Sequence, residues 1–444
     1  MVDAAGASRG RRGLILPVLA ASLCLFGGVV LSLERPRAAV EKPPTVLAAR
    51  AALASPSPEP DPAATRVALG RKIFFDTGLS DPPGTSCATC HDPAHGYAGN
   101  NGSATGVARG SRPDRFARRN TPSVLYLRFV RRFHLRWEED ADLPEASGGF
   151  FWDGRSDSIA SLVRQPLLNP NEMGNRDVAT IATHLESSAY AGELRSQFDD
   201  VFASPESAVR ALGECIEAFL TSAEMSPFSS KYDEYLRGHE ALSPLEAKGL
   251  LLFKDHTKGA CSSCHTMNDR SPMPERSLFT DYGYEALAVP RNRKIASNRD
   301  ARAFDLGVCE RHERQDNHWH TDDEMFCGRF RTPSLRNVAL RTHFMHNGVF
   351  ASLRDVVAFY ATRATDPKRW YERGGFDDLP PKYWSNVNVN PAPYHRREGE
   401  APVLDAEDVD ALVAFLETLT DKKSRSASAS EGATPTAGRD RDLQ

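Results

Sequence analysis

The sequence has almost no net charge, with 55 Lys and Arg residues against 59 Asp and Glu residues and a formal net charge of −4 over 444 residues. It therefore lacks the excess of basic residues that a nucleic-acid binder or a generally cationic surface requires, and nucleic acid is excluded as a partner. The apolar and charged fractions, 40% and 26%, are those of an ordinary globular protein. At about 150 residues per domain, the length predicts two or three domains.

The first 36 residues lack an obvious cleavage site. Arg9, Arg11 and Arg12 precede an uncharged apolar run over residues 13–33, and a basic segment followed by an apolar run is typical of an export signal. The run is also just long enough to span a bilayer, and no A-x-A pattern is evident around residues 34–40. Residues 1–36 are therefore interpreted as a signal peptide or as an N-terminal anchor in the inner membrane. Both alternatives place the rest of the chain in the periplasm.

Two further segments lack the composition of a folded core. Residues 37–64 are rich in Ala and Pro, which is typical of a semi-rigid linker. Residues 422–444 are mostly Ser, Ala, Thr, Gly and charged residues, and we expect this tail to be disordered. The folded part is expected between residues 65 and 421.

Cysteine is scarce, yet four of the eight residues form two C-x-x-C-H motifs, Cys87-Ala88-Thr89-Cys90-His91 and Cys261-Ser262-Ser263-Cys264-His265. This spacing is the attachment signal of a c-type haem. Two thiols one helical turn apart can form thioethers with the vinyl groups of one haem, and the next residue brings its imidazole under the iron. A zinc half-site and a redox-active C-x-x-C are the alternatives. Because both motifs follow an export signal, and c-type haem is attached outside the cytoplasm, they predict two covalently bound c-type haems.

The remaining cysteines of the predicted folded part have simpler interpretations. Cys309 and Cys327 lie in one loop-like segment, and an oxidising compartment favours a disulfide between them. Cys215 falls on a predicted helix and is interpreted as a buried free thiol.

The apolar periodicity is mainly helical. It predicts a helix over residues 206–221, and N-cap residues predict the starts of three more helices, at Ser243, Ser352 and Asp405. Long loops are expected at residues 96–120, 140–150, 266–335 and 364–404. Residues 65–238 and 239–421 each contain one C-x-x-C-H motif followed by a Thr-Pro-Ser motif. We therefore expect a mainly α fold with two cytochrome-c-like domains, each carrying one covalently attached haem.

Several motifs occur in a defined order along residues 65–420. In chain order around the first haem motif they are Leu69-Gly70-Arg71-Lys72-Ile73-Phe74-Phe75-Asp76, Arg119-Asn120-Thr121-Pro122-Ser123, Phe151-Trp152-Asp153-Gly154-Arg155, Pro166 and Glu172-Met173. After the second haem motif come Thr332-Pro333-Ser334-Leu335-Arg336-Asn337-Val338 and His346-Asn347-Gly348. In this order the motifs resemble those of the bacterial di-haem cytochrome c peroxidase and MauG family.

The resemblance implies roles for individual residues. The haem at Cys87, Cys90 and His91 would be the peroxidatic one, in the domain over residues 65–238. The haem at Cys261, Cys264 and His265 would be the electron-entry or charge-storage haem, in the domain over residues 239–421. Trp152 resembles the tryptophan that relays electrons between the haems, Glu172 the carboxylate that moves a proton between peroxide oxygens, and Pro166 the proline that lines the peroxide pocket. A packing aromatic and a solvated carboxylate are the alternatives for Trp152 and Glu172.

The resemblance also implies one calcium ion between the domains. Asn120 matches its side-chain ligand, and the backbone carbonyls of Arg341 and His343 match the other protein ligands. An oxygen-only site completed by waters suits calcium. The alternative is that Asn120 is an ordinary turn residue.

Three positions depart from the peroxidases of this family. Many of them carry a His after the first haem that blocks the iron, but residues 96–120 contain no His or Met. Tyr97 is the one soft candidate there, and His134 lies in an insertion. The first haem is therefore predicted to be open at rest, as in MauG-like members. The family's distal glutamine, ten residues past the tryptophan, is Leu162 here, and Gln165 is out of register by three, which predicts a weaker hydrogen-bond network around Glu172.

The second axial ligand of the second haem is the third departure. Peroxidases usually have Met there, but the matching position holds Tyr360, as in MauG-like proteins. A phenolate ligand lowers the potential of a haem, whereas Met raises it. A core tyrosine is the alternative interpretation of Tyr360, with Met345 or Met325 as the ligand instead.

The insertion around residues 124–150 is strongly charged. Nine Arg lie between Arg109 and Arg136 against one acid, Asp114, and an acidic run follows directly. The arginines are interpreted as partners of haem propionates, as a docking surface for an acidic partner, or as a solvated loop.

The resemblance thus implies a haem peroxidase. The leading hypothesis is the reduction of hydrogen peroxide to water with electrons from a small cytochrome c or cupredoxin. The absent blocking His and Tyr360 favour a second hypothesis, MauG-like peroxide-driven oxidation of a Trp or Tyr in a partner protein. A third is a non-catalytic di-haem electron-transfer cytochrome, which predicts two six-coordinate irons and no reaction with peroxide. Glu172 and Pro166 argue against the third.

Overall fold

The computed structural model describes residues 61–137, 144–310, 324–372 and 375–422. Within these ranges the chain is mainly helical, with two small antiparallel sheets, as the periodicity predicts. The predicted export segment, nearly all of the predicted linker and the tail after residue 422 lie outside the described residues. No helix of the described part is both long and apolar enough to cross a membrane.

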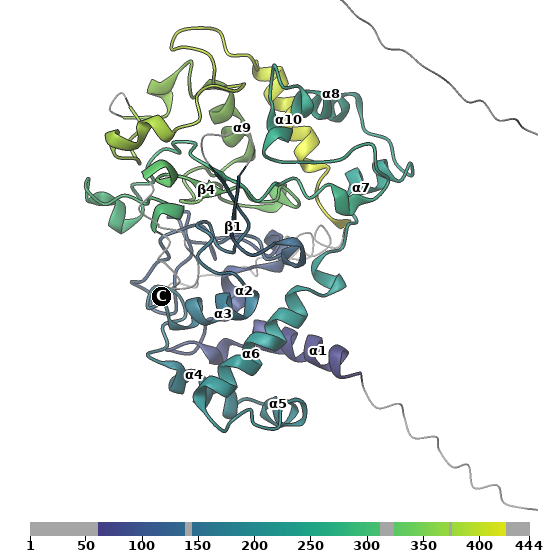
Figure 1. Cartoon of the computed structure of the whole chain (residues 1–444), viewed down its shortest axis with the longest axis vertical. Coiled ribbons are helices and arrows are strands. Elements are labelled where there is room, and N and C mark those ends of the chain that lie inside the picture. The colour runs from purple at the N-terminus through teal and green to yellow at the C-terminus, as the bar shows by residue number, and fades with distance from the viewer. Residues whose placement is uncertain (1–60, 138–143, 311–323, 373–374, 423–444) are drawn as a thin grey trace, which may run out of the picture. The chain divides into compact units, whose positions relative to one another are not determined.

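Helix α1 (Pro62–Phe75) crosses α6 (Pro205–Leu220) at a glycine, and Figure 1 shows the two helices side by side. A Cβ on Gly70 would lie 1.9 Å from the backbone oxygen of Cys215 on α6, so the crossing requires glycine. Asp61 caps α1 by accepting the Ala63 N–H at 3.0 Å. The helix begins at Pro62, inside the predicted linker. Proline is well tolerated at this first helical position.

The second half repeats this crossing. Helix α8 (Pro244–Lys254) packs on α10 (Ala406–Glu417), and a Cβ on Gly249 would lie 2.0 Å from the backbone oxygen of Ala411. In each half the glycine lies on the helix that precedes the C-x-x-C-H motif. The weak internal repeat of the sequence therefore has a structural counterpart.

The four predicted helix positions are confirmed. The helix predicted over residues 206–221 is α6, and a capping box at Ser243 starts α8. Ser352 caps α9 (Leu353–Thr362) and Asp405 caps α10. Five further helices have no separate sequence prediction: α2 (Cys87–Cys90), α3 (Ile159–Leu168), α4 (Val178–Glu186), α5 (Ala191–Gln197) and α7 (Lys231–Leu236).

Two large apolar clusters form the core. The first gathers buried residues between Leu69 and Phe228, and the second gathers buried residues between Tyr232 and Leu419. Tyr232 of α7 packs on Phe279 and Phe415 with ring centroids 5.4 and 5.5 Å apart, so α7 belongs to the second core although residues up to 238 were assigned to the first domain. The described residues form one compact unit. The division into two domains stays a prediction.

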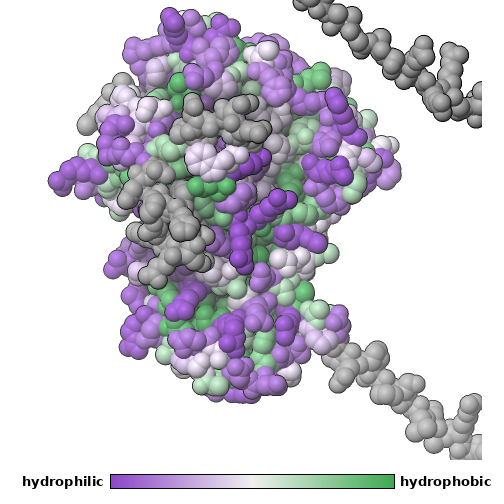
Figure 2. Space-filling model, in the orientation of Figure 1, coloured by the Kyte–Doolittle hydropathy of each residue, from purple (hydrophilic) through white to green (hydrophobic). Residues whose placement is uncertain are grey.

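Two short strand pairs interrupt the predicted loops. Strands β1 (His134–Arg136) and β2 (Glu145–Ser147) pair antiparallel within the charged insertion, with Arg136 opposite Glu145 and 2.7 Å from its carboxylate. Strands β3 (Tyr284–Glu285) and β4 (Phe330–Arg331) also pair antiparallel. On the face drawn in Figure 2, hydrophobic residues appear as small groups among hydrophilic ones.

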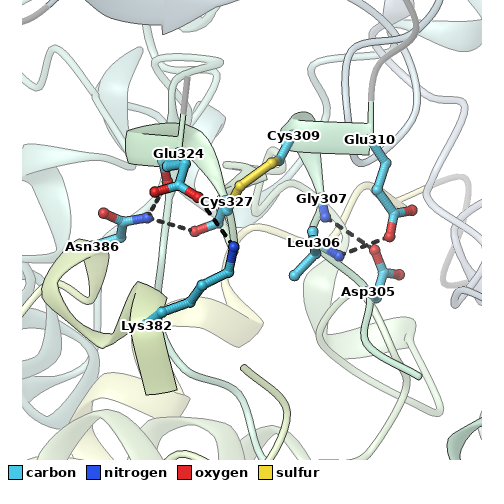
Figure 3. The surroundings of a disulfide bond; sticks show 9 residues. All are labelled: Asp305, Leu306, Gly307, Cys309, Glu310, Glu324, Cys327, Lys382 and Asn386. Carbon is cyan, nitrogen blue, oxygen red and sulfur yellow. Dashed lines mark hydrogen bonds and ion pairs between the residues drawn. A yellow bond between two sulfur atoms is a disulfide. The ribbon is translucent and has the colours of Figure 1, made fainter. Parts of the chain in front are cut away.

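A disulfide joins Cys309 and Cys327, as predicted for an oxidising compartment (Figure 3). The carbonyl of Cys327 accepts a hydrogen bond from Asn386 at 3.0 Å, and Glu324 pairs with Lys382 at 3.1 Å. The disulfide and these contacts together connect the segment around Cys309 to the turn that contains Lys382 and Asn386. Cys215 is buried and free, as predicted.

Candidate functional site

The first C-x-x-C-H motif lies on one helical turn. Cys87 and Cys90 begin and end α2, and a capping box between Ser86 and Thr89 starts it, with N–H to oxygen distances of 2.9 and 3.2 Å. The two thiols are therefore presented one turn apart on a backbone whose first N–H groups are satisfied.

His91 follows this turn with its ring held from behind. Its Nδ1 lies 3.0 Å from the carbonyl of Pro122 and 3.3 Å from that of Tyr97. Two carbonyl acceptors place the ring proton on Nδ1 and leave Nε2 as the free ligand atom. Burial lowers the pKa of His91 to about 4, so the imidazole is neutral at pH 7, the form that binds iron.

The second motif has the same design. Cys261 begins a 3-10 turn (Cys261–Ser263), and the Nδ1 of His265 lies 3.0 Å from the carbonyl of Phe279. Burial lowers the pKa of His265 to about 4, although hydrogen bonds to the backbone of Phe279 and Pro333 act in the opposite direction. Each Thr-Pro-Ser motif thus places a proline backbone next to a motif histidine. This contact gives a physical reason why the Thr-Pro-Ser motif occurs once in each half.

A cavity contains two of the residues that the resemblance assigns to the peroxide pocket, Pro166 and Glu172. This first-site cavity is lined by Arg155, Ser161, Arg164, Gln165, Pro166, Leu168, Asn169, Pro170 and Glu172. Pro166 and Glu172 are therefore brought together, as predicted. Burial raises the pKa of Cys90 to about 12, and the negative charge of Glu172 adds to this rise, which indicates that the carboxylate lies near the first motif. The lining residues of this cavity include no His, Met or Tyr, and the open first haem stays a prediction.

The two other candidates for a blocking ligand lie elsewhere. Tyr97 offers its carbonyl to His91 on the opposite side of the ring, and its own ring packs on Phe74 at 6.0 Å. His134 lies exposed on β1, with Nδ1 3.0 Å from the carbonyl of Arg132. Neither lines the first-site cavity.

A polar network surrounds Glu172. Asn169 donates to its carboxylate at 2.8 Å, and Gln165 accepts a hydrogen bond from Arg155 at 2.8 Å. Gln165 is one turn beyond Leu162 on α3, so it reaches the same cavity although it is out of register. Burial raises the pKa of Glu172, and the Arg155 charge and the Asn169 hydrogen bond oppose this rise. Asn169, three residues before Glu172, therefore supplies a partner that the sequence did not indicate, and the prediction of a network weaker than in the peroxidases stays a prediction.

Trp152 lies buried between the two halves. Its Nε1 donates to the carbonyl of Asn120 at 2.7 Å, and its carbonyl accepts the N–H of Arg331 at 2.8 Å. It also lines the second cavity described next. These contacts on both sides fit a relay position and are also those of a well-packed aromatic residue.

A second cavity contains the second motif. This second-site cavity is lined by Cys261, Cys264 and His265 together with Tyr360 on α9. Tyr394 and Met345 line it too, and the Tyr394 ring lies 6.0 Å from that of Tyr360. Burial raises the pKa of Tyr360. Met325 instead packs against a separate apolar cluster with Phe133 and Tyr284. The ligand candidates are therefore Tyr360, Met345 and Tyr394, and sequence reasoning missed the last of these.

Two arginines of the second-site cavity, the buried Arg331 and the half-buried Arg341, fit a haem. Arg331 donates to the carbonyl of Gly149 at 2.7 Å, and Arg341 donates to that of Thr121 at 3.0 Å. Within the described ranges neither forms an ion pair with an acid, and burial lowers the pKa of both, that of Arg341 to about 10. A buried cation needs an anion, and haem propionates would supply it through charge-assisted hydrogen bonds. Together with the two attachment motifs, these cations make the donor set suitable for haem.

Arginines of the charged segment have other partners. Arg118 pairs with Glu310 at 2.7 Å, and Arg119 pairs with Asp153 at 2.6 Å and with Asp305 at 2.7 Å. These two arginines therefore join the halves of the chain through ion pairs, Arg119 in a buried position and Arg118 in a partly exposed one. The acidic run after Arg136 falls largely outside the described residues.

The surroundings of Asn120 match a calcium site in ligand type. Its Nδ2 donates to the carbonyls of His343 at 2.9 Å and Met345 at 3.2 Å, while its Oδ1 is buried without a hydrogen-bond partner. Rotation of the amide by 180° would place Oδ1 beside these carbonyls and create an oxygen-only set. Of the two carbonyls expected from the sequence, that of His343 contacts Asn120, and Met345 supplies the other. No group of three His, Cys, Asp or Glu residues in the described part forms a metal site.

Comparison with known proteins agrees with this geometry. Residues 64–241 match the family model for the di-haem cytochrome c peroxidases. The methylamine utilization protein MauG of Paracoccus denitrificans is 36% identical over 365 residues, which cover 80% of this chain and 88% of MauG. The chain belongs to the di-haem cytochrome c peroxidase family.

Further proteins are similar to this chain in structure or in sequence. The diheme peroxidase BthA from Burkholderia thailandensis superposes with a TM-score of 0.77 at 48% sequence identity, over 85% of this chain and 89% of BthA. The cytochrome-c peroxidase IdrP2 of a Pseudomonas species is 28% identical over 66% of this chain and 72% of its own length. The expected family and the helix-dominated fold are therefore confirmed.

Proposed function

We propose that the chain reduces hydrogen peroxide to water with electrons from a small cytochrome c or cupredoxin. Each peroxide takes up two electrons and two protons and yields two waters. Two c-type haems, bound through Cys87 and Cys90 and through Cys261 and Cys264, supply the redox chemistry when present. His91 and His265 hold their irons from one side, each as a neutral imidazole oriented by backbone carbonyls.

The observation that carries this proposal is the first-site cavity. It presents the Glu172 carboxylate next to Pro166, without a residue that could block the iron. Glu172 would move a proton from one peroxide oxygen to the other, so that the second oxygen could depart as water. Asn169 holds the carboxylate in place at 2.8 Å, and Pro166 narrows the cavity.

Trp152 would carry electrons between the two haems. Its indole lies between the halves and is hydrogen-bonded at 2.7 Å to Asn120, directly after Arg119. The backbone contact from Arg331 ties the same residue to the second-site cavity. This placement supports a relay role.

The test is stopped-flow absorption after hydrogen peroxide is added to the as-isolated diferric protein. A fast Soret change that reduced cytochrome c reverses is expected. The Glu172→Gln variant should slow the change about 100-fold, because general acid–base catalysis contributes on this order. Glu193→Gln, at an exposed carboxylate paired with Lys72, is the control and should leave the rate unchanged. An unaltered rate in Glu172→Gln would remove the proton-transfer role.

A second candidate function is MauG-like oxidation of a Trp or Tyr in a partner protein. Tyr360 in the second-site cavity favours it, because a phenolate ligand stabilises oxidised iron. In the same experiment this function predicts a fast Soret change that reduced cytochrome c does not discharge. A non-catalytic electron-transfer cytochrome predicts no change at all, even after one haem is reduced.

The remaining elements of the proposal concern binding and location. Residues 65–238 would carry the peroxidatic haem and residues 239–421 the electron-transfer haem. One calcium ion would bind at Asn120 with the carbonyls around His343. The chain would be exported to the periplasm by residues 1–36, as a cleaved signal peptide or as an inner-membrane anchor. Residues 37–64 would then act as a linker.

A further inference from the structure

A half-buried carboxylate, that of Glu285, lies against the second haem-attachment motif. Glu285 is the last residue of β3, and side chains alternate along a strand. Tyr284 therefore points away and donates to the carbonyl of Gly148 at 2.7 Å, while Glu285 lines the second-site cavity with Cys264 and His265. The Oε1 of Glu285 lies 3.6 Å from the sulfur of Cys264.

The carboxylate is held in place but not neutralised. Asn388 donates to its Oε2 at 3.2 Å. Arg363, which lies against the Tyr394 ring at 3.9 Å, donates to the carbonyls of Leu287 and Asn388. Across the described ranges Glu285 has no ion pair with a basic side chain. The positive charge of Arg329 acts on the carboxylate without forming an ion pair with it, and the negative charge of Asp281 acts in the opposite sense. Glu285 therefore keeps its carboxylate toward the cavity and the Cys264 sulfur.

Attachment of a haem strengthens this arrangement. A thioether sulfur carries no hydrogen, so Cys264 cannot donate to Glu285 once the haem is bound. The carboxylate then lies beside a sulfur that is covalently joined to the macrocycle. An electron added to that haem is repelled by a fixed negative charge in a site of low dielectric constant.

We propose that the Glu285 carboxylate lowers the reduction potential of the second haem and favours its oxidised state. The proposal rests on haem attachment at Cys261 and Cys264 under the function proposed above. Glu285 contacts neither peroxide nor iron, so it is a positioning residue that acts on the second haem through its charge. A Tyr360 phenolate would act in the same direction, so that both groups suit a haem that stores oxidising equivalents.

The test is a spectroelectrochemical titration of both haems in Glu285→Gln and wild type. The equilibrium constant for reduction of one haem should rise about tenfold, a shift of 59 mV for a one-electron couple. The titration wave that shifts should be the one that also shifts in Tyr360→Met. Because burial raises the pKa of Glu285, the titration is run at pH 7 and at pH 9. A shift at either pH supports the proposal, and its absence at both overturns it.

Three further variants separate charge from structure. Glu285→Asp keeps the charge and should retain most of the wild-type potential, which a purely structural role would not predict. Glu407→Gln, an exposed acid on α10, should shift neither wave. If Glu285→Gln does not accumulate, the smaller neutral variant Glu285→Ser gives the same comparison. Peroxide reactivity is measured separately, so that a potential shift without peroxide chemistry would overturn the proposed function alone.

Discussion

Replacement of Arg119 by methionine tests whether a buried ion cluster holds the two halves together. The Arg119 side chain is 12% exposed and binds Asp153 and Asp305, whose side chains are 5% and 9% exposed. Arg118, its neighbour in sequence, is 44% exposed and pairs with the partly exposed Glu310 (28%), shown in Figure 3. The two arginines therefore differ mainly in burial, and Arg118→Met is a matched control.

The magnitude follows from the charges that each substitution leaves behind. Breaking a buried pair from one side costs about 3–5 kcal/mol, because a buried charge remains without a partner. We expect the lower end, since Arg155 stays 3.0 Å from Asp153 and Arg118 lies 3.8 Å from Asp305. The exposed pair of Arg118 contributes about 1 kcal/mol or less.

The pH dependence gives an independent check. Burial by itself would raise the pKa of Asp305 and of Asp153, but Arg119 holds both below their usual range. The stabilisation is therefore fully present above the unfolded-state pKa of about 3.9 and is lost as the pH falls toward the folded-state values. The stability difference between wild type and Arg119→Met should shrink below about pH 4.

The assay is guanidinium unfolding followed by circular dichroism at pH 7 and pH 3.5, with all proteins in the same haem state. Arg119→Lys, which keeps one charge but loses the two-pronged contact with Asp305, should fall between wild type and Arg119→Met. Equal losses for Arg119→Met and Arg118→Met at pH 7 would refute the assignment of stability to the buried cluster.

Further predictions concern the relay, the second ligand and the helix crossing. Trp152→Phe should leave the first Soret change after peroxide intact. It should slow electron delivery from the second haem at least about tenfold, because the indole that is hydrogen-bonded at 2.7 Å is lost. An unchanged delivery rate in double-mixing stopped flow would exclude the relay role. Tyr360→Met should raise the potential of the second haem and shift its ferric spectrum, because Met ligation favours reduced iron; if neither changes, Met345 or Tyr394 is the ligand. Gly70→Ala should destabilise the fold by about 1–3 kcal/mol or more, because its Cβ would lie 1.9 Å from a backbone oxygen on α6, whereas Gly192→Ala, with nothing within 4 Å, should be neutral or stabilising in thermal unfolding.

Local features of the site were predictable from the sequence because they depend on neighbouring residues. The C-x-x-C-H spacing places two thiols on one helical turn, and Ser243, Ser352 and Asp405 cap helices through hydrogen bonds to N–H groups two or three residues later. The ordered motifs brought Pro166 and Glu172 to one cavity, as expected. The disulfide between Cys309 and Cys327 followed from their proximity in the chain and the expected compartment.

Contacts between distant segments were not predictable in this way. Gln165 lies out of register by count, yet it reaches the first-site cavity because it shares one face of α3 with Ser161 and Leu168, four residues before and three residues after it. Helix α7 lies on the first-domain side of the sequence boundary, yet Tyr232 completes the second core. Arg331 and Arg341 carry no sequence signal that separates them from the other arginines, and their lack of acidic partners becomes visible only in the folded chain.

The sequence by itself determined the family, the two attachment motifs, the helical fold class and the residues from which a peroxide site can be built. These depend on spacing and order, which are properties of the chain alone. The tertiary structure decided which charges are paired and which face a cavity. Arg119 is neutralised by two acids from distant segments, whereas Glu285 lies against Cys264 and forms no ion pair within the described residues. The free energy of a buried charge depends on the partners within a few ångströms, and folding alone selects those partners.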